Sequence, residues 1–112
     1  MNVRKVKLVM EGNPLGPRFK EYRKNNKFTD IKIKTGNVEM DAHRMVLEEA
    51  SPVIKTMLES HLFNENVLEF KEENVDPEIL EDLLNVFYTI PIEITTQNAF
   101  SLCIAAHYLS KQ

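Results

Sequence analysis

The sequence holds a single cysteine, no tryptophan and only three glycines among its 112 residues. A lone cysteine, Cys103, allows no internal disulfide, and the lack of such bonds is typical of proteins kept in a reducing compartment. The glycines, Gly12, Gly16 and Gly36, are scattered, so no glycine-rich loop of the kind that cradles a phosphate group is present. The composition therefore excludes a disulfide scaffold and the common nucleotide-binding loops.

Long hydrophobic runs are also missing. No stretch approaches the roughly 20 apolar residues of a membrane-spanning helix, and residues 1–10 alternate basic with apolar side chains, unlike a secretory signal. We therefore expect a cytoplasmic or nuclear protein with no membrane contact. Hydrophobic and charged residues make up 43% and 28% of the chain, which is ordinary for one globular domain.

The residue types that usually carry catalysis or metal binding are few and scattered. His43, His61 and His107 fall in separate predicted elements without the spacing of metal ligands. We expect His43, between a strand and a helix, to serve as a cap or a core hydrogen-bonding group. Cys103 and His107 lie four residues apart on one predicted helix, but two such side chains make an incomplete site, and we interpret both as core residues. Acidic residues at 72–78 lack the ligand pattern of a calcium loop. The sequence predicts no catalytic residue, no metal and no cofactor, and hence an interaction surface.

Positive charge is concentrated at one end of the chain. Residues 1–27 hold eight Lys or Arg and two Glu, whereas residues 28–112 hold six Lys or Arg and fifteen acidic residues. The net charge of −3 thus divides into +6 and −9. A basic arm can contact nucleic acid, but an acidic body would repel phosphates. We favour a solvated helix face, or an arm that folds onto an acidic neighbour such as a second copy.

Alternating and helical patterns organise the first half of the sequence. Residues 1–14 form an arm whose apolar residues Val6, Leu8 and Met10 alternate as in a short strand. A helix follows, with one apolar stripe on a basic background. Residues 28–34 alternate as a strand, and Gly36-Asn37 predicts a tight turn into a returning strand at 38–41. The stripe of the helix consists of Leu15, Phe19 and Tyr22.

Proline marks the beginning of two predicted helices. Ser51-Pro52 and Asp76-Pro77 each combine a capping oxygen with proline at the first helical position, where its missing N–H is harmless. We expect wide apolar faces behind both caps, and we expect the second helix to end at Pro91. The first apolar face comprises Val53, Ile54, Met57, Leu58 and Leu62, and the second comprises Ile79, Leu80, Leu83, Leu84 and Phe87.

Shorter segments complete the prediction. We expect a helix at 43–50, strands at 67–70 and 92–94, and a last helix that Thr95 or Thr96 caps and that runs to Leu109. A hairpin followed by helices and single strands is an α+β pattern, with short helices clustered around a small sheet.

Several motifs in this order resemble those of the BTB/POZ domain family. Phe28-Thr29-Asp30-Ile31 resembles the first strand of the family, and Ala42-His43-Arg44 with Val46-Leu47 and Ser51-Pro52 resembles its AH(K/R)xVL…S signature. The stretches 74–89 and 98–109 are similar to its D-P-E…LLxFxYT and N…LLxAAxYL helices. The resemblance covers residues 15–112 and implies the BTB/POZ fold, to which many members add further helices at the C-terminus. Ile54 stands where the family has phenylalanine.

The resemblance implies a dimer. The stripe of Leu15, Phe19 and Tyr22 would be the dimer helix of the family. In the zinc-finger branch an N-terminal strand crosses to the partner, and here Val6, Leu8 and Met10 would pair with a strand formed by Ile92 and Ile94. We prefer this swapped strand to a disordered tail. The resemblance also implies a buried charge pair between Asp30 and Arg44 at the floor of the dimer groove, against the alternative of a surface pair worth little.

Two partners fit the resemblance. Members of the family that serve as adaptors of ubiquitin ligases dock a cullin scaffold through an apolar-x-Glu motif after the second helix. Phe63-Asn64-Glu65 matches that motif in part, which suggests a cullin-binding site. The alternative is a domain of a transcription regulator, whose dimer groove binds a segment of a co-repressor. The residues assigned to cullin binding are Met57, Leu62, Phe63 and Glu65.

Overall fold

The computed structural model describes residues 15–60 and 66–110 of the chain. The predicted strand of the N-terminal arm lies outside the described residues, and so do Leu62, Phe63 and Glu65. The elements follow one another as α1 (Leu15–Lys24), β1 (Ile31–Thr35), β2 (Val38–Ala42), α2 (Arg44–Ala50), α3 (Pro52–Glu59), β3 (Val67–Phe70), η2 (Pro77–Ile79), α4 (Leu80–Phe87) and α5 (Ala99–Leu109).

The three strands form one mixed sheet in the order β2-β1-β3. β1 and β2 are antiparallel and joined at Gly36, whose φ of 60° suits glycine, so the predicted hairpin is confirmed. β1 and β3 are parallel, with Ile33 opposite Leu68, and the connection between them carries α2 and α3. Ile31 and Ile33 point into the core, whereas Lys32 is exposed, as the alternation predicts.

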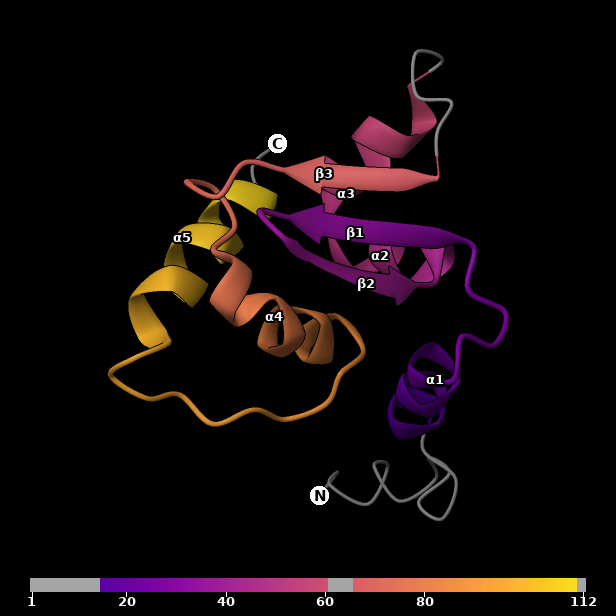
Figure 1. Ribbon diagram of the computed structural model, residues 1–112, viewed down its shortest axis with the longest axis horizontal. Coiled ribbons are helices and arrows are strands. Elements are labelled where there is room, and N and C mark those ends of the chain that lie inside the picture. Colours follow the sequence, from indigo (N-terminus) through magenta and orange to yellow (C-terminus); the bar gives the residue numbers. More distant parts are fainter. Residues whose placement is uncertain (1–14, 61–65, 111–112) are drawn as a thin grey trace, which may run out of the picture.

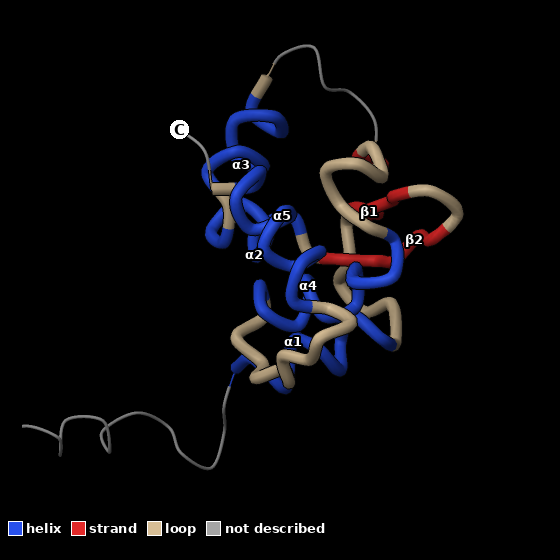
Figure 2. The backbone as a smooth tube through the Cα atoms, turned by 90° about the vertical axis from the view of Figure 1, so that its left-hand side faces the viewer, coloured by secondary structure: helices blue, strands red, loops and turns tan. Residues whose placement is uncertain are grey.

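Helices cover the sheet on one face and at one end (Figure 1). α2 and α3 pack against each other behind the strands, and α5 lies near the C-terminal ends of β1 and β3. Figure 2 shows α2, α3 and α5 gathered on one side of the strands. α1 stands apart from this cluster and approaches the body beside β2. No helix in residues 15–60 and 66–110 is long and apolar enough to cross a membrane.

Both predicted proline caps are confirmed. The Ser51 hydroxyl accepts a hydrogen bond from the Ile54 amide at 3.1 Å and donates one to the Leu109 carbonyl at 2.6 Å. It therefore joins the beginning of α3 to the end of α5. The Asp76 carboxylate accepts from the Glu78 amide at 2.9 Å, and the segment that it caps opens as the 3₁₀ turn η2 before α4.

The predicted end of α4 at Pro91 is wrong. The helix ends at Phe87, and the next turn closes through a hydrogen bond of 2.8 Å from the Ile90 amide to the Asn85 carbonyl. Thr89 has a φ of 59°, so this end is a Schellman motif in which threonine takes the left-handed position that glycine usually fills. Proline follows such a motif because it cannot continue a helix.

The predicted strand at 92–94 is also wrong. The described sheet contains only β1, β2 and β3, and the segment has irregular backbone. Ile92 is half-buried and Ile94 is 63% exposed, so alternation alone did not supply a neighbouring strand. α5 begins at Ala99, later than predicted, although the Thr95 hydroxyl does accept from the Asn98 amide at 3.2 Å.

The hydrophobic core lies where the sheet meets α2, α3, α4 and α5. Its fully buried side chains include Ile33 of β1, Leu47 of α2, Ile54 of α3 and Leu84 of α4. At the edge of the core, Phe70 of β3 meets Tyr108 of α5 edge-on, with ring centroids 6.1 Å apart. Within the described residues, α1 contributes no side chain to this core, and its apolar residues belong to a separate surface.

Candidate functional site

A group of large apolar side chains is left exposed between α1 and α2. Leu15 of α1, Phe28 of the following loop and Met45 of α2 have exposed fractions of 66%, 74% and 69%. Phe19 and Tyr22 stand beside them and are half-buried. A soluble protein seldom leaves such a patch uncovered unless it meets a partner. We call these five residues the α1–α2 surface.

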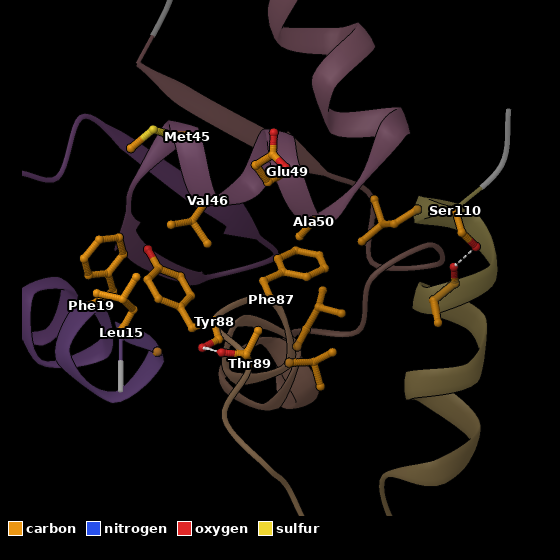
Figure 3. Close-up of a pocket in the computed structure, with 15 residues that line it drawn as sticks. Leu15, Phe19, Met45, Val46, Glu49, Ala50, Phe87, Tyr88, Thr89 and Ser110 are labelled. Atoms are coloured by element: carbon orange, nitrogen blue, oxygen red, sulfur yellow. Dashed lines mark hydrogen bonds between the residues drawn. The ribbon is translucent and has the colours of Figure 1, made fainter. Parts of the chain in front are cut away.

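A groove with a volume of about 700 Å³ opens on one side of this surface. Its walls come from α1, α2, α5 and the end of α4, and they are mostly apolar. Figure 3 shows Phe87 facing Ala50 across the groove, with Leu15 and Phe19 at the opposite side from Ser110. Fifteen residues line the groove: Leu15, Gly16, Phe19, Met45, Val46, Glu49, Ala50, Leu83, Val86, Phe87, Tyr88, Thr89, Ala106, Leu109 and Ser110.

A second, aromatic pocket of about 340 Å³ shares Phe19 and Met45 with the groove, so the two hollows form one continuous surface. Phe19 and Tyr22 lie with their ring centroids 6.1 Å apart, and Phe28 meets Tyr22 edge-on at 5.5 Å. The Asp30 carboxylate is the only acidic group among the residues that line this pocket. The remaining lining residue is His43.

α1 is held to the body by one buried arginine. Arg23 is 4% exposed, its guanidinium stacks 4.8 Å from the centre of the Tyr88 ring, and its Nη2 donates to the Asn85 side chain at 3.3 Å. Its Nη1 lies 3.7 Å from Glu81, and its buried Nε has no hydrogen-bond partner. The aromatic face of Tyr88, the carboxylate of Glu81 and the hydrogen bond to Asn85 together stabilise this buried cation.

Basic side chains of α1 surround the carboxylate of Glu81 on α4. Burial alone would raise the pKa of this carboxyl, but its hydrogen bond and ion pair with Lys24, at 3.1 Å, outweigh burial and lower the pKa. Arg23 and Lys20 act in the same direction. Glu81 therefore stays ionised at neutral pH and keeps α1 docked electrostatically as well as by packing.

A hydrogen-bonded relay fixes the loop after α1. The Nε2 atom of His43 lies 3.0 Å from the Lys27 carbonyl, which can only accept, so this nitrogen must carry the proton. In the neutral ring Nδ1 is then an acceptor, and the Tyr88 hydroxyl donates to it at 2.7 Å. The same hydroxyl accepts from the His43 amide at 2.9 Å. Burial raises the pKa of Tyr88 despite its hydrogen bond with His43. The core hydrogen-bonding role predicted for His43 is confirmed.

The predicted charge pair between Asp30 and Arg44 is wrong. Asp30 is exposed, and its Oδ1 accepts from the Arg44 backbone amide at 2.7 Å, so it caps the beginning of α2. The Arg44 side chain turns the other way, pairs with Glu48 at 2.7 Å and donates to the Leu58 carbonyl at 2.7 Å. Glu48 lies one helical turn after Arg44 and binds its guanidinium near the surface. This pair costs less desolvation free energy than a buried pair with Asp30 would.

The other predicted site residues are spread over the chain. Met57 is half-buried on α3 and lines neither hollow. Leu15, Phe19 and Tyr22 do lie together on the α1–α2 surface. Cys103 is exposed and so is His107, so their predicted core role is wrong. In the described part of the chain, no group of three or more His, Cys, Asp or Glu is placed to hold a metal ion.

Sequence reasoning missed three residues of the site. Met45 follows Arg44 at the beginning of α2 and reads as an ordinary helix position. Phe28 was expected to begin a strand, but it sits in the loop with a φ of 62°. Gly16 reads as punctuation, yet a Cβ at this position would clash with the Tyr88 carbonyl. Gly16, Phe19 and Arg23 are spaced so that they share one face of a helix. This spacing is the only sequence signal that could have indicated a docking face.

Comparisons with known proteins agree with this architecture. The family model of the BTB/POZ domain matches residues 19–112. Kelch-like protein 41a of Danio rerio is 30% identical over 105 residues, and Kelch-like protein 3 of Homo sapiens is 32% identical over 98 residues. These matches cover 88% and 85% of this chain but only 17% of each relative, so the chain spans less than a fifth of their length.

A solved structure shows the same fold. The BTB domain of zebrafish PATZ1 superposes with a TM-score of 0.75 and 22% identity, covering 88% of this chain and 79% of that one. Five helices and a small three-stranded sheet in the described residues match that fold. The fold, the family match and the relatives together identify the chain as a member of the BTB/POZ domain family, a family of protein-interaction modules.

Proposed function

We propose that this domain forms a homodimer through the α1–α2 surface and docks a cullin scaffold, as the dimerising half of a ubiquitin-ligase substrate adaptor. The observation that carries the dimer is the exposure of Leu15, Phe28 and Met45 on one continuous surface. Covering three large apolar side chains removes enough surface from water to favour association by several kcal/mol. A two-fold contact would bury this surface once from each copy.

The segment after Pro91 supports a second dimer contact. It has irregular backbone, and Ile94 is 63% exposed. No strand of the described sheet competes for pairing there, and the alternating residues Val6, Leu8 and Met10 are suited to supply a strand from another chain. In this proposal the predicted pairing of Ile92 and Ile94 forms only when two copies meet.

The dimer is tested by a charge placed at the centre of the surface. Met45→Glu should weaken dimerisation at least about a hundredfold, because an unpaired carboxylate would be buried in an apolar contact. A chain without residues 1–10 should dimerise more weakly yet remain folded. Sedimentation equilibrium measures both. Phe100→Glu is the matched control, since Phe100 is 75% exposed on α5 and lines neither hollow. An unchanged dimer in Met45→Glu would assign the contact to another face.

Support for the cullin comes from the relatives and from the sequence. The matching relatives are Kelch-like proteins, and Phe63-Asn64-Glu65 fits in part the motif by which cullin-docking members of the family are known. Met57, half-buried on α3, precedes Phe63 by six residues in the sequence. We assign Met57, Leu62, Phe63 and Glu65 to the cullin contact.

Calorimetric titration with the N-terminal region of a cullin tests this assignment. We expect micromolar or tighter binding, and we expect the pair Phe63→Ala and Glu65→Ala to abolish it while the dimer persists. Lys55→Ala, an exposed position of α3, is the control that should leave binding intact. A folded dimer without cullin affinity would favour the alternative function, a transcription-regulator domain whose groove binds a co-repressor segment. The alternating apolar residues in the sequence of the N-terminal arm favour this alternative.

A further inference from the structure

Asp30 carries a charge that no side chain in the described part of its own chain neutralises. Its Oδ1 accepts from the Arg44 amide, but within residues 15–60 and 66–110 no Lys, Arg or His side chain lies at ion-pair distance from it. Its second carboxylate oxygen has no described partner either. Asp30 is exposed and lines the aromatic pocket, so this oxygen is available to a donor from outside the chain.

The rings next to Asp30 are arranged to receive a cation. Tyr22 and Phe28 meet at an interplanar angle of 81° and form a corner in the pocket wall. The Lys27 ammonium already lies 5.9 Å from the centre of the Tyr22 ring, which shows that this ring accepts a positive charge. Aromatic faces beside a carboxylate are the usual means of recognising an ammonium or guanidinium group.

The backbone of Phe28 is strained to hold this corner. Its φ of 62° is rare for an aromatic residue and costs about 1 kcal/mol. The chain gains no burial in return, because Phe28 remains 74% exposed. Burial of the ring therefore does not repay the strain, and a contact of the ring with another molecule would do so.

Arg18 of α1 is the cation that fits this pocket from a second copy. The other basic residues of α1 are occupied or covered: Arg23 is buried, Lys24 pairs with Glu81, and Lys20 is half-buried. Arg18 is exposed and, among the described residues, has no hydrogen bond or ion pair. It lies on one stripe of α1 with Leu15 and Tyr22, each of which lines one of the two hollows.

We propose that in the dimer the guanidinium of Arg18 from each copy enters the aromatic pocket of the other and pairs with its Asp30. Two-fold symmetry makes this contact twice, and the basic N-terminal part of one chain thereby meets the acidic body of its partner. The planar guanidinium can stack on Tyr22 and Phe28 while it donates to the carboxylate. This inference rests on the proposed dimer and specifies what sets its register.

A double-mutant cycle on the dimer tests the pairing. Asp30→Asn removes the charge and keeps an oxygen that can cap α2, and Arg18→Met removes the charge and keeps a long side chain. Each single change should raise the dissociation constant of the dimer about tenfold, since a desolvated charge pair is lost at two symmetric places. The dissociation constant of the double variant should be no higher than the higher of the two single-variant constants. Sedimentation equilibrium at low and high salt gives the four constants.

Lys55→Met is the matched control, because Lys55 is exposed on α3, lines neither hollow and should leave the dimer unchanged. Additive effects of the two changes, or single variants with an unchanged constant, would overturn the Arg18–Asp30 pairing while the dimer stands. A wild-type chain that stays monomeric at all concentrations would overturn both the pairing and the proposed dimer. Circular dichroism of each variant confirms that the fold is intact before its constant is used.

Discussion

Replacing Leu47 by alanine is expected to lower the free energy of unfolding by about 2–5 kcal/mol. Leu47 is fully buried and stands on the inner face of α2, where the hydrophobic core meets the sheet. Removing its branched end loses the free energy of burial and leaves a cavity that rigid neighbours on α3 and α4 cannot fill. Chemical denaturation followed by circular dichroism measures the loss.

Met45, two residues earlier on the same helix, provides the comparison. Met45→Ala should change the free energy of unfolding by no more than about 0.5 kcal/mol, because its side chain is 69% exposed. It should instead weaken dimerisation, since it empties the shared wall of both hollows. The two substitutions thus separate the face of α2 that builds the fold from the face that meets a partner. Equal destabilisation by both would contradict this division.

Replacing Gly16 by alanine is expected to lower the free energy of unfolding by about 1–3 kcal/mol. Helix propensity alone predicts the opposite sign, because alanine favours a helix over glycine by about 1 kcal/mol. The new methyl group would run into the Tyr88 carbonyl and the Thr89 hydroxyl, so α1 must shift away from the end of α4. The Tyr88 carbonyl belongs to the backbone, so it cannot avoid the methyl group by changing rotamer.

Glu21→Ala separates the two effects in the same helix. Glu21 is exposed, and alanine there should be neutral or slightly stabilising. The rate of amide hydrogen exchange in residues 15–24 should increase in Gly16→Ala and stay unchanged in Glu21→Ala, since only the first change loosens the docking of α1. A stabilised Gly16→Ala would show that α1 does not need this close approach.

Local chemistry made much of the fold predictable. Ser51-Pro52 and Asp76-Pro77 form the helix caps that their side chains predict, and Gly36 adopts the positive φ of a hairpin turn. These features depend on atoms within a few residues of each other, so the sequence states them directly. The apolar stripe of α1 was likewise visible, because helical spacing alone defines it.

The wrong predictions share a dependence on distant partners. Arg44 had two acids within reach, and only the folded chain shows that Glu48, on the same helix, takes the guanidinium. The alternation of Ile92 and Ile94 predicts a strand, but a strand exists only where another offers its backbone groups, and the described sheet offers none there. Cys103 has the neighbours of a core residue in sequence, yet it lies on the outer side of α5.

The site was only half visible for the same reason. Leu15, Phe19 and Tyr22 were found from periodicity, whereas Met45 and Phe28 join them only because α2 and the loop after α1 meet in space. The positive φ of Phe28 has no sequence signal, since aromatic residues rarely adopt it. An interaction surface assembled from three segments cannot be read from any one of them.

The mixed sheet has a consequence for the order in which the chain folds. β1 and β2 are joined by a two-residue turn, so this hairpin can form within microseconds from local contacts alone. β3 pairs with the opposite edge of β1 in parallel, and a chain stretch that includes α2 and α3 must first be brought around. Closing that loop is entropically costly and makes non-local pairing slow. We expect the pairing of β3 with β1 to limit the folding rate. The hairpin, α2 and α3 would form a partly ordered nucleus before this step.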